Sequence, residues 1–521
     1  MNKGGFEMRN KKMLVIFGAI IIIGSIGVAG ISVENNLSTE LILMEKYFDE
    51  TAFGQMLDEG WPLIMDEGIE DAANAMTYDS EGNIIVTGHS FDLEPFVSKI
   101  ILLKIDISGN QVWNISWDGP GVDYAADIVV DSQDNIIVYG ANASTLDEFH
   151  NLSINMFLIK FDKNGNEIWQ KNFRRGNNTF PGGIAIDSND NIILGEGFGN
   201  LSFYEFTSIT TKFDPDGQEL WSRIFQEDMM DIASAVAVDS QDNIINSGFF
   251  IEFFVGQGLY NIKYDSNGNQ IWMKRLDNTM QPVNMIIDYE DNIIIGGQGF
   301  TQTSSKWSTI KCDGNSKILW ERQYFSGEGD YSSDIDVDSQ GNIIIVGSSG
   351  FGQNNNSEHC AIYYDKNGKE LGLKRSNING HLNAVIFDNQ DSVIVGGTVR
   401  SEEYNWDFYV DKYVDLTPPS STIAKPEDKI LYLFDSKIMP TVLSKKSVII
   451  GKITIEVNTE DANEVDKIEF YIDHVLKQTV DNPPYKWTWN EMGFGDRTIT
   501  TIVYDETGAA SRNEITVFKI I

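Results

Sequence analysis

One short phrase recurs seven times along this 521-residue chain and constrains its fold more than any other feature. It reads Asp-Ser-Glu-Gly-Asn-Ile-Ile at its first occurrence and starts, in units 1 to 7, at Asp79, Asp131, Asp187, Asp239, Asp288, Asp338 and Asp388. The steps between these aspartates are 52, 56, 52, 49, 50 and 50 residues. A period near fifty built from strands and turns predicts an array of β-sheets in which each unit buries its faces against its neighbours.

Each unit also has a second half that repeats. It is clearest at Ile159 to Trp169 and recurs before Trp113, Trp221, Trp272 and Trp320, whereas unit 6 has Gly372 in the Trp slot. Short β-branched runs predict strands buried on both faces, and the Asp/Asn/Gly clusters between them predict hairpin turns. Each unit is therefore predicted to form four antiparallel strands, a to d, with the Trp on strand d.

The count of strands indicates how the array ends. In unit 7 the pattern breaks at Asp415, so strand d is missing there. At the other end Trp61 lies 18 residues before Asp79, which is the spacing of Trp113 to Asp131. We therefore predict an all-β fold with a seven-bladed β-propeller, whose last blade takes its outer strand from the N-terminal end. An open solenoid is the alternative, and it leaves the Trp61 strand unexplained.

Residues 61 to 415 resemble the secreted seven-bladed β-propeller repeat family of bacteria and archaea. Its signature is Asp-x-x-Gly-Asn-Ile-Tyr-Val-Thr-Gly, which Asp79 to Gly88 match almost completely. The resemblance implies a fold and not an activity. The Gly-Asn-Glu-Ile-Trp half is also similar to the tryptophan-docking phrase of quinoprotein propellers. Those usually have eight blades and a calcium-held quinone over vicinal cysteines, features that this sequence does not have.

The repeat stops at Thr417-Pro-Pro, and residues 417–521 have the alternation and turn spacing of a β-sandwich. Asp466 to His474 and Pro484 to Trp489 are similar to the immunoglobulin-like domains of prokaryotic surface proteins. That resemblance implies a spacer or adhesive unit, in which the aromatic residues of these two segments (Phe470, Tyr485 and Trp487) are packing residues.

The N-terminus predicts a membrane anchor. Residues 1–12 form a basic cytoplasmic tail, 13–32 an apolar transmembrane signal anchor, 33–58 a tether and 59–416 the propeller. Basic residues before the apolar stretch and an acidic chain after it place the propeller and the sandwich outside the cell. The alternative is cleavage near Gly30, which would release a secreted form.

The amino-acid composition of the chain limits which kinds of partner and metal it can bind. The net charge of −38 repels nucleic acid. Cys312 and Cys360 lie in neighbouring units, so they are either two buried thiols or one disulfide between blades, and no Cys/His spacing suggests zinc. The sequence does not define an oligomeric state.

The lengths of the loops predict which face of the propeller binds a partner. The a–b and c–d turns are short, whereas the b–c loops and the d–a crossovers, which share the opposite face, are long and varied. Aromatic residues in or beside them are candidate ligand contacts, with loop packing as the alternative: Phe91, Phe149, Tyr204, Phe253, Phe254, Trp307 and Trp406.

Acidic residues are expected at the channel mouth and inside it. Asp71, Asp123, Asp231 and Asp330 stand eight positions before the repeat aspartate in four of the seven units. Asp127, Asp334 and Asp336 lie within the predicted inner strands. These carboxylates could hold calcium or supply an acid–base pair, or they could cap turns and strand starts. Apart from calcium, no cofactor is expected.

No catalytic motif is present in the sequence. The favoured function is a membrane-anchored cell-surface binding or adhesion protein that presents its loop face to a glycan, a peptide or an envelope partner. The alternative is an extracellular carbohydrate-active lyase or hydrolase, or a quinoprotein-like enzyme, that uses the channel mouth.

Overall fold

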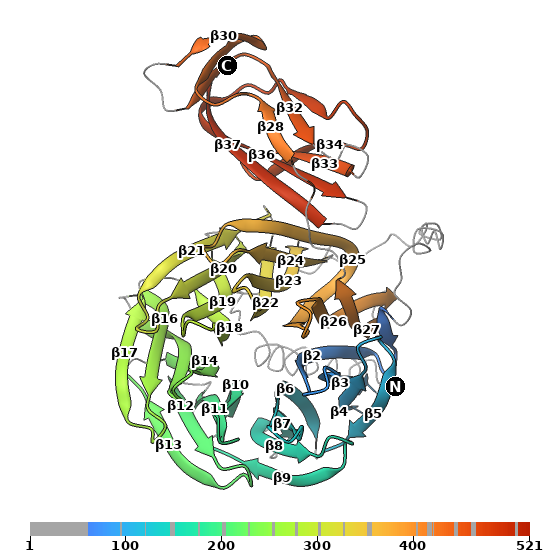
Figure 1. Ribbon diagram of the computed structural model, residues 1–521, viewed down its shortest axis with the longest axis vertical. Helices are drawn as coiled ribbons and strands as arrows, with labels where there is room; N and C mark the ends of the chain where they lie inside the picture. Colours follow the sequence, from blue (N-terminus) through green and yellow to red (C-terminus); the bar gives the residue numbers. More distant parts are fainter. Residues whose placement is uncertain are drawn as a thin grey trace, which may run out of the picture. The chain divides into compact units, whose positions relative to one another are not determined.

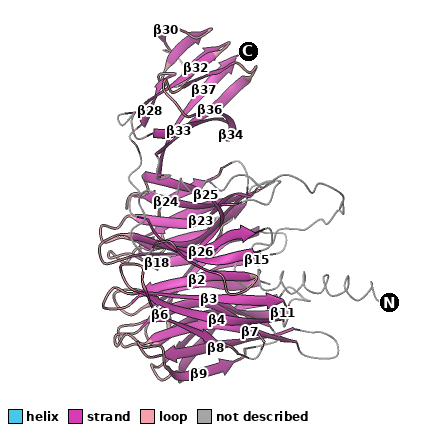
Figure 2. Cartoon of the chain, turned by 90° about the vertical axis from the view of Figure 1, so that its right-hand side faces the viewer, coloured by secondary structure: helices cyan, strands magenta, loops and turns pink. Residues whose placement is uncertain are grey.

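The computed structural model describes residues 61–521 apart from short gaps, and all regular elements in that part of the chain are β-strands (Figure 2). The gaps lie at 94–95, 120, 146–151, 176–177, 201–204, 228–229, 253–255, 277–279, 301–303, 327–328, 352–356, 403–404, 414–418, 420, 442–445, 460–464, 506–508 and 521. No helix in the described ranges is long and apolar enough to cross a bilayer, and the predicted anchor at 13–32 lies outside them. The chain divides into two compact units, one up to Val283 with Tyr404–Lys412 and one of Asn284–Glu403 with Tyr413–Ile521.

The first compact unit holds four antiparallel sheets of four strands each (Figure 1). Sheet 1 comprises β2 (Glu70–Tyr78), β3 (Ile84–Leu93), β4 (Phe96–Ile105) and β5 (Gln111–Trp117). Sheet 2 comprises β6 (Val122–Val130), β7 (Ile136–Thr145), β8 (Leu152–Phe161) and β9 (Glu167–Phe173). Sheet 3 comprises β10 (Asn178–Ile186), β11 (Ile192–Asn200), β12 (Glu205–Phe213) and β13 (Glu219–Phe225). Sheet 4 comprises β14 (Met230–Val238), β15 (Ile244–Glu252), β16 (Gly256–Tyr264) and β17 (Gln270–Leu276).

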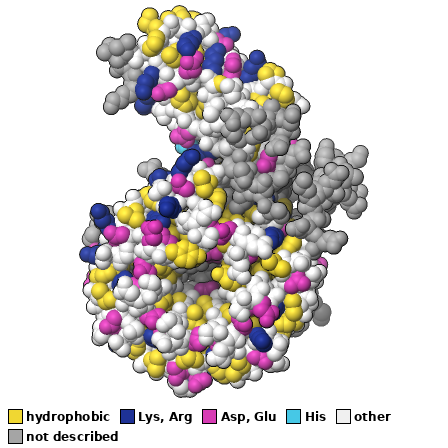
Figure 3. Space-filling view, in the orientation of Figure 1, with side chains coloured by type: hydrophobic (Ala, Val, Ile, Leu, Met, Phe, Trp, Pro, Cys, Tyr) yellow, Lys and Arg dark blue, Asp and Glu magenta, His cyan; other side chains and the backbone are white. Residues whose placement is uncertain are grey.

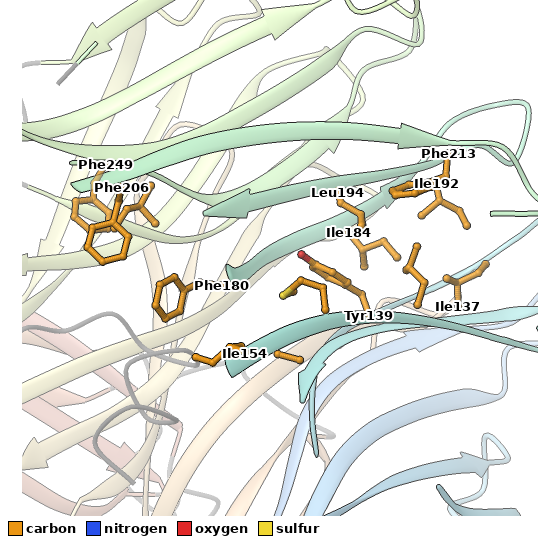
Figure 4. Close-up of a cluster of buried hydrophobic side chains, with 14 residues drawn as sticks. Ile137, Tyr139, Ile154, Phe180, Ile184, Ile192, Leu194, Phe206, Phe213 and Phe249 are labelled. Carbon is orange, nitrogen blue, oxygen red and sulfur yellow. The ribbon is translucent and has the colours of Figure 1, made fainter. Parts of the chain in front are cut away.

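The predicted a-to-d strands are therefore confirmed in units 1 to 4. The a–b hairpins form because the repeat aspartate organises the turn: Asp79 Oδ1 accepts hydrogen bonds from the backbone N–H of Glu81 at 3.0 Å and of Asn83 at 2.9 Å. The strands between the turns are aliphatic and bury both faces, as the sequence predicts. Figure 4 shows one such layer, where Tyr139 of sheet 2 packs beside Ile184 and Leu194 of sheet 3.

Neighbouring sheets follow one another by a repeated contact. In sheets 1 to 3 the third strand meets the first strand of the next sheet in parallel, as in Ser98 with Val122 and Phe206 with Met230. The tryptophan of strand d also docks on the next sheet: Trp221 Nε1 donates to Ser266 O at 3.2 Å. A Cβ at Gly268 would lie 2.8 Å from the Trp221 ring, so glycine in this turn makes room for the tryptophan.

The predicted pairing of the two ends of the repeat region is confirmed within the first compact unit. β1 (Leu63–Met65) pairs antiparallel with β27 (Asn405–Tyr413), with Leu63 opposite Val410. β27 also meets β2 in parallel through Trp406 and Glu70. The parallel contact of β27 with β2 is therefore the same kind of contact that β4 makes with β6.

Further sheets of the same kind follow, and apart from the first three residues of β18 (Gln281–Ile287) they belong to the second compact unit. Sheet 5 comprises β18, β19 (Ile293–Phe300), β20 (Ser305–Cys312) and β21 (Ile318–Tyr324). Sheet 6 comprises β22 (Gly329–Val337), β23 (Ile343–Phe351), β24 (Glu358–Tyr364) and the first part of the long strand β25 (Glu370–Phe387). The last part of β25 pairs with β26 (Val393–Glu402).

A β-sandwich follows in the same compact unit. One sheet holds β28 (Ser421–Lys425), β32 (Ile453–Thr459) and β35 (Lys486–Trp489). The other holds β29 (Ile430–Leu433), β30 (Ser436–Pro440), β31 (Ser447–Ile450), β33 (Val465–Ile472), β34 (Val475–Val480), β36 (Phe494–Asp505) and β37 (Ala509–Ile520). Phe470 and Tyr485 are buried in the core between the sheets and Trp487 packs against it, so the prediction that these aromatics are packing residues is confirmed.

The sandwich contacts sheet 6 through a short strand pairing of two residue pairs. β37 pairs antiparallel with β25, where Ala510 lies opposite Leu373. A mixed hydrophobic cluster covers this seam, with Tyr324 and Leu373 from the propeller side and Tyr471, Ile502 and Tyr504 from the sandwich. Unit 6 is also the unit in which Gly372 replaces the strand-d tryptophan, and here the outer strand has a neighbour of its own.

Candidate functional site

The repeat aspartates are structural residues. Asp79 forms a buried ion pair with Lys104 at 2.6 Å, and equivalent pairs join Lys160 to Asp131 and Lys212 to Asp187. Burial raises the pKa of Asp79, but the bonds from Lys104, Asn83 and the turn amides outweigh it, so the pKa lies below its usual value. These carboxylates stabilise the hairpins as anions. Their oxygens are already engaged by the lysine, the asparagine and the turn amides, so they are not available to bind a ligand.

The four acids predicted at the channel mouth act as turn caps. Asp71 accepts a hydrogen bond from Gly68 N at 2.9 Å, Asp123 from Gly119 N at 2.8 Å and Asp231 from Glu227 N at 2.8 Å. Asp330 accepts from the backbone and hydroxyl of Ser326, each at 2.7 Å. The capping alternative is therefore confirmed for all four.

Burial makes three of these caps, Asp71, Asp123 and Asp330, less acidic than ordinary carboxyl groups. It raises the pKa of Asp123 to about 6, because the bond from Gly119 N only partly offsets the loss of solvent. Burial also raises the pKa of Asp330, against hydrogen bonds from Ser326 and Ser349. Asp123 therefore titrates near neutral pH, which is a property that acid–base chemistry needs.

The three acids predicted on inner strands each lie on the first strand of one unit and accept a hydrogen bond from the first strand of the next unit. Asp127 of β6 accepts from Ile184 N of β10 at 3.0 Å. Asp334 and Asp336 of β22 accept from Val385 N and Phe387 N of β25 at 2.8 and 2.7 Å. Burial raises the pKa of Asp127 to about 6 and of Asp334 and Asp336 to about 7, against these amide bonds.

No three His, Cys, Asp or Glu side chains in the described part of the chain are grouped to hold a metal ion. Calcium binding by Asp127, Asp334 and Asp336 stays a prediction. Cys312 and Cys360 are both free and buried, which agrees with the interpretation as two buried thiols.

The aromatic residues predicted to face a ligand divide into three groups. Phe91 and Trp307 are buried, with exposed fractions of 5% and 1%, which agrees with the alternative that they are packing residues. Trp307 packs against Tyr324, with ring centroids 5.6 Å apart. Trp406 is half-buried at the contact of β27 with β2. The remaining candidates (Phe149, Tyr204, Phe253 and Phe254) lie outside the described residues.

Sequence reasoning missed a buried acid in unit 3. Nine positions after the repeat aspartate six units have glycine, because strand a passes too close for a side chain; at Gly88 a Cβ would lie 1.9 Å from Ala72 O. Unit 3 has Glu196 in this slot. The register of β10 shifts between Pro181 and Ile184, opposite Glu196, as the register of β2 shifts between Ala73 and Ala75 opposite Gly88. The exception to the repeat was visible in the sequence and could have identified this residue.

Glu196 is fully buried and belongs to a small charged network. Its Oε2 accepts a hydrogen bond from Thr211 Oγ1 at 2.9 Å and lies 3.5 Å from Arg175 Nε. Arg175 Nη2 donates to Glu219 at 2.9 Å and to Thr211 at 3.2 Å. In the same unit Thr179 replaces the turn-capping aspartate, and its hydroxyl lies 3.4 Å from Arg175 N.

The charge of Glu196 is poorly compensated. Its Oε1 is buried and accepts no hydrogen bond from any described residue. Burial raises the pKa of Glu196 to about 7, against the attraction of Arg175 and the bond from Thr211, and Glu219 adds to the rise. The network can therefore take up or release a proton near neutral pH.

Comparison with known proteins defines the second domain. Residues 443–517 match the bacterial Ig domain family Big_7. The chain therefore combines β-propeller sheets with a bacterial immunoglobulin-like domain.

Similarity over the repeat region is distant. An uncharacterized WD repeat-containing protein, L264, of Acanthamoeba polyphaga mimivirus is 24% identical over 201 residues, which cover 28% of this chain and 14% of that protein's length. The extracellular domain of the putative hybrid two component system BT4673 of B. thetaiotaomicron is 11% identical, with 87% of this chain and 57% of that chain covered and a TM-score of 0.40. The β-propeller domain of the trilobed protease of Pyrococcus furiosus is 8% identical, with 66% and 94% covered and a TM-score of 0.41.

Proposed function

We propose that this chain is a membrane-anchored extracellular binding protein, in which a seven-bladed propeller presents its loop face to a glycan, a peptide or an envelope protein. One observation carries the choice of binding over catalysis. All seven acids predicted at the mouth and in the first strands have carboxylate oxygens bonded to backbone amides, as Asp123 is to Gly119 N and Asp336 to Phe387 N. Residues that fasten turns and strands in this way are poorly placed to react with a substrate.

A closed ring of seven blades is supported by a pairing of residues between successive turns. Ser80 donates to Asp134 of the next unit through Oγ at 2.8 Å. The same bond recurs from Ser132, Ser188 and Ser339 to the units after theirs, with partners Asp190, Asp242 and Asp391.

The two units that lack this serine support closure as well. Unit 5 has Tyr289 instead, and unit 6 correspondingly has Gly341 in place of the aspartate. Unit 7 has Asn389, and the glycine that would complement it is Gly82 of unit 1. The pattern fits if unit 7 precedes unit 1 in a ring.

The same turns favour the loop face as the binding surface. On the tight-turn face the short hairpins are bonded to one another, so their backbone and aspartate groups are already engaged. Partners would then bind the opposite face, which carries the variable loops. The sandwich, seated on sheet 6 through β37, would serve as a fixed second contact and not as a loose spacer.

The proposal is tested by screening the extracellular region, residues 36–521, on glycan and peptide arrays with and without calcium. Trp406→Ala removes an aromatic side chain from the predicted loop face and should lower the affinity for a ligand found on the arrays at least tenfold. The control is Tyr289→Ala, which removes an aromatic that is 78% exposed in the opposite turns and should leave binding unchanged. Equal loss in both variants, or turnover of a polysaccharide without array binding, would contradict the proposal.

A carbohydrate-active enzyme is the second candidate. The observation that favours it is Asp123, whose pKa burial raises to about 6. If Asp123 is an acid catalyst, Asp123→Asn abolishes polysaccharide cleavage while the unfolding midpoint changes little. If it is only a cap, the substitution lowers stability and no cleavage is seen in either protein.

A further inference from the structure

Glu196 and Arg175 connect two sheets. Glu196 stands on β11 in sheet 3, while Arg175 follows β9, the last strand of sheet 2. Tyr139 of β7 in sheet 2 also lies beside the network, and its hydroxyl is 3.5 Å from Gly195 O, next to Glu196. The ion pair therefore links the end of one sheet to the buried middle of the next.

The network has one cation for two acids. Arg175 faces Glu196 and Glu219 together, and its side chain is 20% exposed against 0% for Glu196 and 41% for Glu219. The titratable or charged groups of the network are Arg175, Glu219 and Tyr139, and the carboxylate of Asp127 on β6 acts on Tyr139 in turn. Within the described part of the chain, Thr211 is the neutral side chain that donates a hydrogen bond to the Glu196 carboxylate.

This arrangement differs from a well-made buried ion pair. A buried carboxylate is stable as an anion when both oxygens have donors and the cation is in good geometry. Glu196 Oε1 has no donor among the described residues, and Arg175 Nε makes no hydrogen bond although it lies 3.5 Å from Oε2. Proton uptake by Glu196 would remove the buried charge and leave Arg175 with Glu219.

We propose that Glu196 and Arg175 form a proton-linked tie between sheets 2 and 3, so that the packing of these sheets weakens as pH rises from acidic values toward neutrality. The tie depends on the single glutamate among the seven equivalent slots, since the other six units of the repeat have glycine there. It is independent of any ligand on the loop face.

The direction follows from linkage. The folded state holds the Glu196 proton more tightly than the unfolded chain does, because the pKa rises from 4.5 to about 7 on folding. Stability from this group is therefore fully present below the unfolded value and is lost as pH rises to about 7. Within that window the folded-to-unfolded ratio falls by up to about tenfold per pH unit from this one group.

The test compares Glu196→Gln with the natural protein by urea unfolding of the full chain between pH 5 and 9. Glutamine keeps the size and cannot ionise, so the variant should match the natural protein at pH 5. It should be more stable at pH 8.5, by a tenfold or greater shift in the unfolding constant. Glu167→Gln is the matched control, since it removes an exposed acid of β9 that is not part of the network and should show no such pH-dependent gain.

Two results would overturn the proposal. If Glu196→Gln is less stable than the natural protein above pH 7, the pair is an ordinary structural ion pair. If the difference between the two proteins does not change with pH, Glu196 does not titrate in this range. Should the variant not fold, hydrogen exchange of the natural protein decides: β11 and β12 amides should lose protection between about pH 5 and 7 relative to the β19 and β20 amides of sheet 5, and equal behaviour of the two sheets would reject the tie.

Discussion

The seam between the sandwich and sheet 6 should contribute measurably to the stability of both. Tyr504, Ala510 and Leu373 lie in one row across β36, β37 and β25, since Ala510 is opposite Tyr504 on one side and Leu373 on the other. Tyr504 and Leu373 are 3% and 2% exposed. Because side chains opposite one another in antiparallel strands share a face, the small Ala510 lets the two larger side chains close over it.

Replacing either large side chain should be costly. Tyr504→Ala removes a buried aromatic ring and should cost about 3 to 5 kcal/mol, while Leu373→Ala should cost about 2 to 5 kcal/mol. Part of the stability lost in Tyr504→Ala comes from the hydrogen bond that the Tyr504 hydroxyl donates to Glu469 at 3.0 Å. Glu469 keeps the hydrogen bond from Tyr471 at 2.6 Å. Since the two cavities adjoin, the double variant should lose less than the sum, by about 1 kcal/mol or more.

The assay is a double-mutant cycle by urea unfolding of the full chain. Tyr504 paired with Ile455 is the control, because Ile455 belongs to the sandwich core and not to the seam cluster. That pair should be additive within about 0.5 kcal/mol. If Tyr504 and Leu373 are equally additive, the seam does not exist in solution and the sandwich is a separate domain on a linker.

Two further predictions concern the repeat itself. Gly140→Ala should destabilise the protein by about 1 to 3 kcal/mol, because the added Cβ would lie 2.2 Å from Tyr124 O, whereas Gly195→Ala meets its nearest atom at 3.6 Å and should change the thermal midpoint little. Lys160→Met should cost about 3 to 5 kcal/mol, since it leaves the buried Asp131 carboxylate without its cation. The pKa of Asp131 is lowered on folding, because its bonds outweigh burial, so the stability it provides is present above about pH 4 and is lost as pH falls below that value. Acid titration of the unfolding midpoint should show this loss in the natural protein, and an unchanged acid profile in Lys160→Met would refute the assignment.

Much of the fold could be predicted because the repeat makes local information redundant. The aspartate that starts each hairpin, the glycine that admits a neighbouring tryptophan and the Trp61 spacing are properties of short segments. The pairing of β1 with β27 followed from spacing alone and is confirmed.

The candidate site could be predicted less well, because exposure depends on what packs above a residue. Trp307 lies beside a long loop in the sequence, yet Tyr324 and the seam cluster bury it. The carboxylates of Asp71 and Asp330 were recognised as a set, but only the structure distinguishes a turn cap from a free acid, since both begin with the same residue at the same spacing.

By itself the sequence determined the strand count of each unit, the pairing of its two ends and the start of a second β domain, because these depend on periodicity and turn chemistry. Only the tertiary structure decided that β37 extends sheet 6 and that Glu196 is left with one unpartnered oxygen between two sheets. The physical reason is that burial and hydrogen-bond satisfaction arise between segments far apart in the chain, where no local pattern records them.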